Sequence, residues 1–260
     1  MFGEVSVVMP VYNGEEHISE AIESVLNQTY KNLELIIIND GSNDNTFNIL
    51  CNYKKKDRRV SVIVNNRASG GPALPRNLGI RASNGRFIAF IDHDDVWHYK
   101  KLEIQLKFLT DLKLPFISSE RINIKSPQRA LDFKDINLTT NKYLKISADQ
   151  LLCNNLINTS SVVIDKKIIQ KEEFNQESKY IAVEDYIMWV QLHTKFSHSA
   201  KLEIPLIKYR LTNGSISRNK LRMIRRRWSA LEVLVGGSLR LRIKYMFFYM
   251  LSYIKKKYSN

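Results

Sequence analysis

Short apolar runs alternate with amphipathic stretches over the first half of the chain. Each run of apolar and β-branched residues ends at a proline or a polar residue, which is typical of a buried strand. We predict strands at residues 5–9, 34–38, 60–64 and 87–91. Apolar residues at helical spacing predict helices over about residues 18–26, 44–55 and 99–112. Strands that alternate with helices indicate an α/β fold with a mostly parallel, Rossmann-like sheet flanked by helices.

Polar or turn-forming segments follow three of these strands. They are Pro10-Val11-Tyr12, Asn39-Asp40-Gly41 and Asp92-His93-Asp94. In open parallel sheets, ligands bind beyond the carboxyl ends of the strands, and these ends lie at one edge of the sheet. We therefore expect the three segments to form one site.

The second half of the chain has a weaker pattern. A strand is predicted at residues 161–164 and a helix at residues 184–195, whereas the polar residues 120–147 support no assignment. We find no internal repeat and no low-complexity linker.

Composition bounds the size and compartment of the protein, and its uneven charge indicates an anionic partner. The chain has 260 residues, enough for one large α/β domain or two small ones. Two cysteines are too few for a disulfide framework and indicate a reducing compartment, and we expect no signal peptide, since the N-terminus lacks a basic segment. The formal net charge is +14, and the last 60 residues hold 15 Lys and Arg against two acids. Charge gathered in this way indicates an anionic partner, such as a membrane surface or nucleic acid.

The basic C-terminal segment contains an uncharged, aromatic-rich stretch at residues 245–254. It is well short of the roughly 20 residues with which a helix crosses a bilayer. Basic residues flank it on both sides, and Arg225-Arg226-Arg227-Trp228 precedes it. The pattern favours an amphipathic helical segment that lies on an anionic membrane surface, through residues 221–258. The alternative is a helix that packs on the domain with its lysines in water.

Asp92 and Asp94 are candidate metal ligands. In an extended segment, side chains two residues apart point to the same side, roughly 6.6 Å apart along the chain. Carboxylate oxygens suit a hard divalent cation such as Mg²⁺ or Mn²⁺. The alternative is the start of a helix, where acidic residues are also favoured.

Two further clusters have both a functional and a structural interpretation. Gly70-Gly71-Pro72-Ala73 with the following Arg76 could hold a diphosphate, or could be an ordinary loop beside a solvated arginine. Glu184-Asp185 could supply a catalytic base next to aromatic residues, or could be the acidic first turn of a helix. Local sequence alone favours the structural interpretation of both.

Several competing motifs are absent from the sequence. It has no GxxxxGK[ST] phosphate loop, no GxGxxG, no CxxC or HxxxH metal pattern and no serine elbow, and its five histidines are scattered. These absences argue against a kinase, a dinucleotide oxidoreductase, a zinc enzyme and a serine hydrolase.

Taken together, the motifs resemble glycosyltransferase family 2, the inverting nucleotide-sugar transferases with a GT-A fold. The resemblance is carried by VSVVMPVYN (5–13), AIESVLNQTY (21–30), ELIIINDGS (34–42), PRNLGI (75–80), FIDHDD (90–95) and the later Glu184-Asp185, and it covers about residues 4–195. It implies a GT-A domain over residues 1–215, with a nucleotide-sugar half at about 1–100 and an acceptor half at about 101–215. A basic helical extension at 216–260 follows it.

By position, the resemblance implies roles for individual residues. The nucleotide would be bound by Pro10, Tyr12, Asn13, Asp40, Arg76, Asp92 and His93, with the Tyr12 ring stacked on the base and Asp40 accepting a hydrogen bond from it. Asp94, with Asp92, would hold Mn²⁺ or Mg²⁺. Asp185 would be the catalytic base, with Glu184 as its neighbour or substitute.

Two positions depart from the family pattern. Asn39 stands where many relatives have a second aspartate, and Leu74-Pro75 replaces the usual small residues before Arg76.

The implied reaction is a metal-dependent, inverting transfer of a hexose from a nucleotide-sugar, most simply a UDP-sugar, to a hydroxyl of a glycan or polyprenyl-linked acceptor. Such a reaction fits the synthesis of capsule, O-antigen or another bacterial surface polysaccharide. The enzyme would then be cytoplasmic and peripheral, on the inner face of the cytoplasmic membrane, and nucleic acid is not expected as a partner. Two alternatives stay open. One is a non-catalytic nucleotide-sugar-binding protein, and the other is a nucleic-acid-binding protein with a salt-sensitive basic tail.

Overall fold

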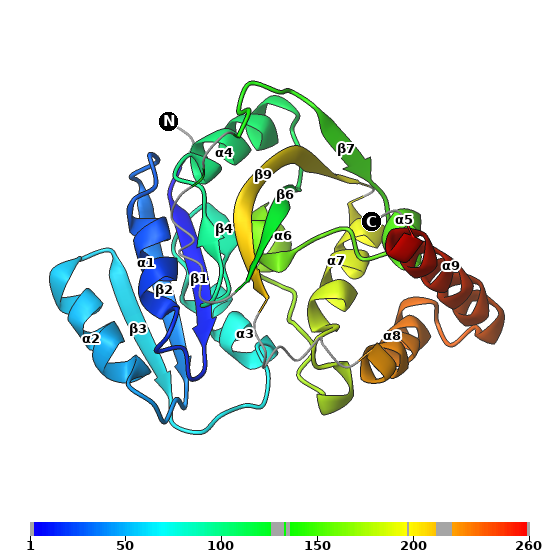
Figure 1. Ribbon diagram of the computed structural model, residues 1–260, viewed down its shortest axis with the longest axis horizontal. Helices are drawn as coiled ribbons and strands as arrows, with labels where there is room; N and C mark the ends of the chain where they lie inside the picture. Colours follow the sequence, from blue (N-terminus) through cyan, green and yellow to red (C-terminus); the bar gives the residue numbers. More distant parts are fainter. Residues whose placement is uncertain (1–2, 126–132, 134–135, 197, 212–219, 259–260) are drawn as a thin grey trace.

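One mixed sheet with helices on both faces forms the body of the molecule (Figure 1). The structure is a computed structural model, and it describes residues 3–125, 133, 136–196, 198–211 and 220–258. The strands are β1 (Val5–Val11), β2 (Leu33–Asp40), β3 (Val60–Asn65), β4 (Phe87–Phe90), β5 (Val96–Trp97), β6 (Phe116–Lys125), β7 (Tyr143–Ile146), β8 (Val163–Asp165) and β9 (Ser199–Leu211). The α-helices are α1 (Ile18–Leu26), α2 (Thr46–Lys56), α3 (Ala73–Ala82), α4 (Lys101–Asp111), α5 (Ala148–Cys153), α6 (Lys166–Ile169), α7 (Glu184–Lys195), α8 (Lys220–Leu234) and α9 (Leu239–Tyr258). Two 3₁₀ turns are η1 (Thr159–Ser161) and η2 (Ser178–Tyr180).

The strand order in the described sheet is β3-β2-β1-β4-β8-β6-β9-β5, and β7 pairs with β9. The first four strands are parallel, as the alternation of strands and helices predicts. Beyond β4 the sheet is mixed, because β8 runs antiparallel to both β4 and β6, while β6 runs parallel to β9. The expectation of a mostly parallel sheet therefore describes the first half. Strand direction in the second half depends on pairings between distant segments, which no local pattern specifies.

Every residue of β1 is buried, because the sheet is covered on both faces. Val7 and Met9 belong to one core with residues of α1 and α4, and Val8 belongs to a second core with residues of α3 and α7. Gly79 of α3 makes the second contact close. A Cβ built there would lie 2.3 Å from Val8 Cγ1, so any larger residue would push α3 away from the sheet.

Most predicted elements are confirmed to within a few residues, and the helix predicted at 184–195 matches α7. The long strands β6 and β9 and the helix α3 were not predicted. β6 reaches into residues 120–125, where alternate residues are exposed, and no strand was predicted in residues 199–211. α3 begins directly after Gly71-Pro72, which by themselves are typical of a loop.

Two helices at the C-terminal end extend away from β3, at the opposite side of the molecule in Figure 1. α8 packs against α7 and η2, and α9 packs against α5 and α8. None of the helices in the described part of the chain combines the length and apolar character that a membrane span requires. The predicted boundary at residue 216 lies outside the described residues, and the division into domains stays a prediction.

Candidate active site

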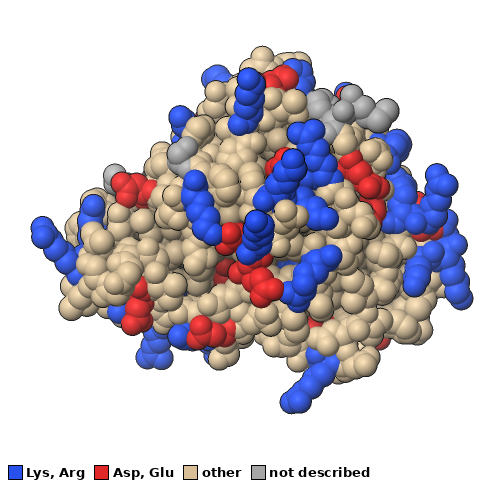
Figure 2. All heavy atoms as spheres, turned by 180° about the vertical axis from the view of Figure 1, so that it is seen from behind, with Lys and Arg blue, Asp and Glu red and all other residues tan. Residues whose placement is uncertain are grey.

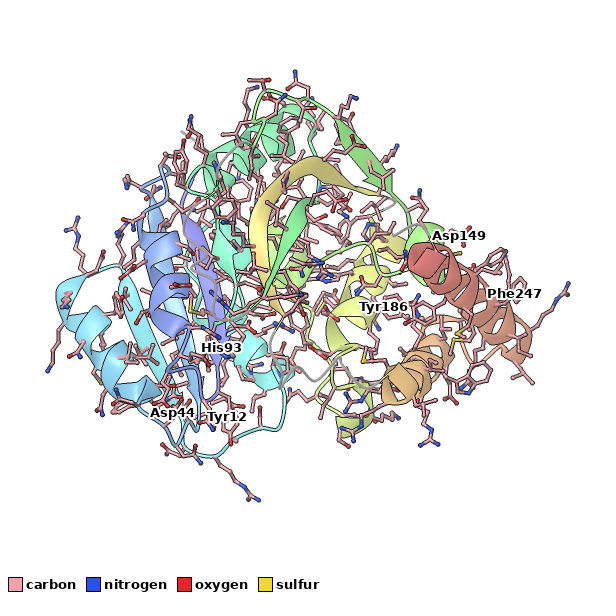
Figure 3. The ribbon with its side chains drawn as sticks, in the orientation of Figure 1. Tyr12, Asp44, His93, Asp149, Tyr186 and Phe247 are labelled. Carbon is pink, nitrogen blue, oxygen red and sulfur yellow. The ribbon has the colours of Figure 1, made fainter. Side chains whose placement is uncertain are left out.

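The carboxyl ends of β1, β2 and β4 lie at one edge of the sheet, as the parallel arrangement predicts. Figure 3 shows Tyr12 and His93 at this edge, with Tyr186 of α7 on the neighbouring part of the molecule. The predicted segments therefore come together, and the first turn of α7 faces them through the ion pairs described below.

The turn after β1 is tied to the turn after β2. The backbone N–H of Asn13 donates to Ser42 Oγ (3.0 Å), and the N–H of Asn43 donates back to Asn13 Oδ1 (2.9 Å). Asn13 has φ 49°, in the left-handed region that asparagine adopts more readily than most residues. The neighbouring Tyr12 is 47% exposed, and the stacking of its ring on a base stays a prediction.

Asp40 ends β2 as a buried side chain whose carboxylate accepts three hydrogen bonds. Oδ1 accepts from Asn65 Nδ2 (2.7 Å), and Oδ2 accepts from the backbone N–H (3.0 Å) and the hydroxyl (2.7 Å) of Ser69. Since each carboxylate oxygen can accept two hydrogen bonds, one position is left on Oδ1. A hydrogen bond from a base at that position stays a prediction.

His93 and Gly14 bring the β1 turn against the segment after β4. A Cβ built at Gly14 would lie 2.7 Å from His93 Cδ2 and from Val11 Cγ2. The absence of a side chain at Gly14 therefore permits this contact. Pro10, predicted to bind the nucleotide, is buried within β1 rather than exposed at the edge of the sheet.

Arg76 links the Asp92 segment to the first turn of α7. Its Nη2 donates to Asp92 Oδ1 and its Nη1 donates to Glu184 Oε1, both at 2.8 Å. The Arg76 side chain is only 4% exposed. Burial by itself would lower the pKa of Arg76, but Asp92, Glu184 and Asp185 raise it, and the net shift is upward. The guanidinium is thus held between two carboxylates, which the sequence pattern did not indicate.

Asp94 is one of the two predicted metal ligands. Burial raises the pKa of Asp94, His93 opposes the rise and Asp92 adds to it. Its oxygens accept no hydrogen bond from another residue in the described part of the chain. The described residues hold no group of three or more His, Cys, Asp or Glu arranged around one metal position. Two carboxylates fit a cation whose remaining ligands are phosphate oxygens and water, as is usual for Mg²⁺.

Arg210 of β9 fixes the backbone of this acidic segment. Its backbone N–H donates to Asp95 Oδ1 and its Nε donates to the carbonyl of Asp94, both at 3.1 Å. Its Nη2 forms an ion pair with Glu20 of α1 (2.6 Å). Burial, together with Asp94 and Asp92, raises the pKa of Asp95 well above its usual range. Asp95 therefore has a structural position beneath the site, held by a residue far away in the sequence.

Glu184 and Asp185 form the first turn of α7 with different surroundings. Burial and the charge of Asp185 raise the pKa of Glu184 to about 7, although Arg76 opposes the rise. Burial also raises the pKa of Asp185, whose side chain stays partly exposed. Thr159 of η1 donates to Asp185 Oδ2 (2.9 Å) and the N–H of Tyr186 donates to Oδ1 (2.6 Å). Asp185 is thus oriented by two hydrogen bonds and remains reachable from solvent.

A pocket of about 210 Å³ opens beside Glu184. Ser69 and residues 71–74 line one side, and Asn175, Gln176 and Ile181 line the other. On the face opposite to Figure 1, acidic side chains gather near the centre, and Lys and Arg side chains are spread around them (Figure 2). The pocket and the catalytic candidates therefore share Glu184.

Comparison with known proteins identifies the family. The model of glycosyl transferase family 2 matches residues 6–164. The chain belongs to glycosyltransferase family 2. One relative, the UDP-Glc:alpha-D-GlcNAc-diphosphoundecaprenol beta-1,3-glucosyltransferase WfgD of Escherichia coli, is 34% identical over 258 residues, which cover 97% of this chain and 94% of WfgD. A second with the same description, WfaP of Escherichia coli, is 32% identical and covers 95% of this chain and 93% of its own.

Solved structures show that this glycosyltransferase has the predicted GT-A fold. Staphylococcus aureus TarS 1–349 in complex with UDP-GlcNAc superposes with a TM-score of 0.74 at 16% identity, covering 95% of this chain and 71% of that one. The mannosyltransferase PcManGT from Pyrobaculum calidifontis, in complex with GDP-Man and Mn²⁺, gives a TM-score of 0.60 at 12% identity, with 99% and 76% covered. At these identities the likeness concerns the fold.

Several residues that shape the site were missed by sequence reasoning. They are Asn65 and Ser69 around Asp40, Thr159 beside Asp185, and Arg210 beneath Asp95. Ser69 directly precedes Gly70-Gly71 of the predicted diphosphate-binding cluster, so extending that cluster by one residue would have included it. Asn65 directly follows the predicted strand at 60–64, so the rule that located Asp40 could have found it, whereas Thr159 and Arg210 carry no local signal.

Proposed function

We propose that this glycosyltransferase moves a hexose from a UDP-sugar to a hydroxyl of a lipid-linked sugar diphosphate, with inversion at the anomeric carbon. The observation that carries the proposal is Arg76, whose two 2.8 Å ion pairs join Asp92 to Glu184. The residues predicted at the donor diphosphate and the predicted catalytic pair therefore occupy one site. The descriptions of WfgD and WfaP support a UDP-sugar donor and a lipid-diphosphate acceptor.

The donor would bind at the edge formed by β1 and β2. The exposed ring of Tyr12 would stack on uracil, and the open acceptor position on Asp40 Oδ1 would take a hydrogen bond from it. Asp94, with Asp92, would hold Mn²⁺ or Mg²⁺ against the diphosphate. A cation bound there neutralises charge on the departing diphosphate, and the Mn²⁺ complex of PcManGT supports this choice of metal.

Asp185 would act as the general base. Its raised pKa suits the removal of a proton from a sugar hydroxyl, and its two hydrogen bonds leave one acceptor position open on each carboxylate oxygen. The hydroxyl oxygen would then attack the anomeric carbon as the bond to the diphosphate breaks. Arg76 would hold Asp92 and Glu184 in register, so that the base and the donor keep their relative positions.

The C-terminal helices would hold the protein at the cytoplasmic face of an anionic membrane. Leu239, Ile243 and Phe247, four residues apart on α9, are 59%, 56% and 59% exposed, and Figure 3 shows Phe247 on the outer side of this helix. Residues four apart share a helix face, so these form an apolar stripe. Arg240 and Lys244 follow the first two stripe residues and would meet lipid phosphates. A second copy of this basic tail would be repelled by its charge.

The transfer itself is tested with a purified protein, Mn²⁺, a panel of labelled UDP-sugars and a short-chain alkyl GlcNAc-diphosphate acceptor. We expect transfer with at least one UDP-sugar and a loss of at least about 100-fold in kcat for Asp185→Asn. Asp111→Asn, which changes an exposed carboxylate of α4, is the matched control and should retain full activity. Absence of transfer from every UDP-sugar, with no UDP binding by calorimetry, would contradict the proposal.

Membrane association is tested by vesicle co-sedimentation. We expect binding to vesicles that contain an anionic phospholipid, weak binding to neutral vesicles, and loss of binding in Phe247→Glu. Phe47→Glu, an exposed aromatic residue on α2 at the other end of the molecule, is the control. Equal binding to neutral and anionic vesicles would contradict the electrostatic part, and a concentration-dependent dimer that Phe247→Glu dissolves would assign the stripe to a second copy.

A further inference from the structure

The arginine run at residues 225–227 of α8 is not a uniform basic surface. Arg227 is buried, and its guanidinium lies 3.8 Å from the ring centroid of Tyr186 and 4.7 Å from that of Tyr249. It also donates two hydrogen bonds to backbone carbonyls of α5. Arg225, one residue before Arg226, is exposed. Arg227 therefore anchors α8 on the rest of the protein, and it determines that Arg225 lies on the exposed face of the helix.

Arg226 lies near the catalytic pair. α8 packs against η2 and against α7, whose first turn carries Glu184. Burial and the charge of Arg222 lower the pKa of Arg226, and Glu184 is the carboxylate that opposes this shift. The two side chains do not form an ion pair, and the Glu184 carboxylate is already paired with Arg76, so Glu184 does not neutralise Arg226.

The guanidinium of Arg226 has unused hydrogen-bonding capacity. Within the described part of the chain none of its N–H groups makes a hydrogen bond, and its Nη1 is buried. Leaving a buried donor without an acceptor is unfavourable, because the group has lost its hydrogen bonds to water. Arg222 lies one turn earlier on the same face of α8, and like charges at this spacing repel each other. A single anion at this face would accept hydrogen bonds from Arg226 and relieve the repulsion.

We propose that Arg226, with Arg222 beside it, binds the diphosphate of the lipid-linked acceptor. This inference rests on the function proposed above and adds the part of the protein that recognises the acceptor. Figure 1 shows α7 between α8 and the strands that carry the donor site. In an inverting displacement the acceptor approaches from the side opposite to the departing diphosphate, so a group on the far side of α7 suits the acceptor rather than the donor.

The order of the helices matches the order of groups in such an acceptor. α9 carries the exposed apolar stripe, α8 packs on α9, and α7 packs on α8 and carries Asp185. A lipid-linked sugar diphosphate has a hydrocarbon chain, then a diphosphate, then the sugar whose hydroxyl reacts. With the chain in the membrane at α9, the diphosphate meets α8 and the sugar meets α7.

Binding of an alkyl GlcNAc-diphosphate and of the matching monophosphate, measured by calorimetry, tests this assignment without requiring catalysis. We expect wild type to bind the diphosphate at least about 10-fold more tightly than the monophosphate, and Arg226→Gln to weaken diphosphate binding by about 10-fold to 100-fold. The diphosphate affinity of Arg226→Lys, which keeps the charge without the planar guanidinium, should lie between those of wild type and Arg226→Gln. UDP binding should be unchanged in all variants, because the donor site is separate.

Arg225→Gln is the matched control, since it removes the same charge from the same helix on an exposed face. The assignment is overturned if Arg226→Gln binds the diphosphate as wild type does, or if Arg225→Gln weakens it equally. A phospholipid site is indicated instead if Arg226→Gln reduces binding to anionic vesicles but leaves the soluble diphosphate unaffected. If Arg226 only supplied charge to Glu184, Arg226→Gln would shift the pH profile of UDP-sugar hydrolysis or transfer for every acceptor while the affinity for the diphosphate stayed constant.

Failure of the proposed function has a different signature. If the protein binds the diphosphate through Arg226 but transfers no sugar, the diphosphate site is supported and the proposed transfer reaction is contradicted. If the protein transfers sugar to the acceptor, and Arg226→Gln has the same KM for that acceptor as wild type, the transfer reaction is supported and the diphosphate site at Arg226 is overturned.

Discussion

Replacement of Arg76 by methionine probes the central link of the site. The side chain is 4% exposed and pairs at 2.8 Å with Asp92, which is 31% exposed, and with Glu184, which is 4% exposed. Methionine fills similar space but leaves Glu184 as a buried carboxylate without its partner. Removing one member of a buried ion pair costs about 3–5 kcal/mol, and nearly all of this should come from Glu184, because solvent screens Asp92.

The loss should depend on pH. In wild type the pKa of Glu184 is about 7, and without Arg76 it will be higher still. At pH 6 the orphaned Glu184 takes up a proton and is no longer a buried charge, so Arg76→Met should be less destabilising at pH 6 than at pH 8. Each unit of pKa difference corresponds to about 1.4 kcal/mol, which sets the size of the change.

Urea denaturation at pH 6 and pH 8 measures both effects. Arg81→Met is the matched control on the same helix, because its ion pair with Glu173 is about half exposed on both sides and should contribute less than about 1 kcal/mol. A double variant, Arg76→Met with Glu184→Gln, should recover part of the stability. If Arg76→Met were no more destabilising than Arg81→Met, or equally destabilising at both pH values, Arg76 could not be the buried link described here.

Three further predictions follow from buried groups. Gly79→Ala should lower stability by about 1–3 kcal/mol in urea denaturation, because its methyl group would lie 2.3 Å from Val8 Cγ1; an unchanged midpoint would show that α3 can shift. Lys101 is buried, has no hydrogen-bond partner for Nζ among the described residues, and burial lowers its pKa well below the usual range, so Lys101→Met should stabilise by about 1–3 kcal/mol near pH 7, with less gain at higher pH. Since the folded protein raises the pKa of Glu184 from 4.5 to about 7, this group should favour unfolding by up to roughly 3 kcal/mol as pH rises through that window, and Glu184→Gln should remove that slope from thermal melts.

The proposed donor contacts and the proposed acceptor contact lie in different parts of the fold. Tyr12 follows β1 and Asp40 ends β2, whereas the proposed acceptor contact comes from α8. The ion pairs of Arg76 lie between these regions and join the donor side to the first turn of α7. Substitutions in α8 are therefore expected to change acceptor affinity with little effect on UDP binding. Substitutions at the ends of β1 and β2 should weaken UDP binding with little effect on acceptor affinity.

By itself, the sequence determined the parallel half of the sheet and the edge at which the site lies. Buried parallel strands are continuous apolar runs, and the polar residues that end them stand next to one another once the strands are aligned. The segments containing Tyr12, Asp40 and Asp92 could be located in this way, and α7 was predicted from its periodicity.

Only the tertiary structure decided how these residues are held. Arg76 and Glu184 are 108 residues apart, and Asp95 and the backbone of Arg210 are 115 apart, so no local pattern could pair them. The direction of β8 and the burial of Arg227 within a run of like residues depend equally on distant partners. Local periodicity records which face of an element is buried, whereas the pairing of charges requires that separate elements first be packed together.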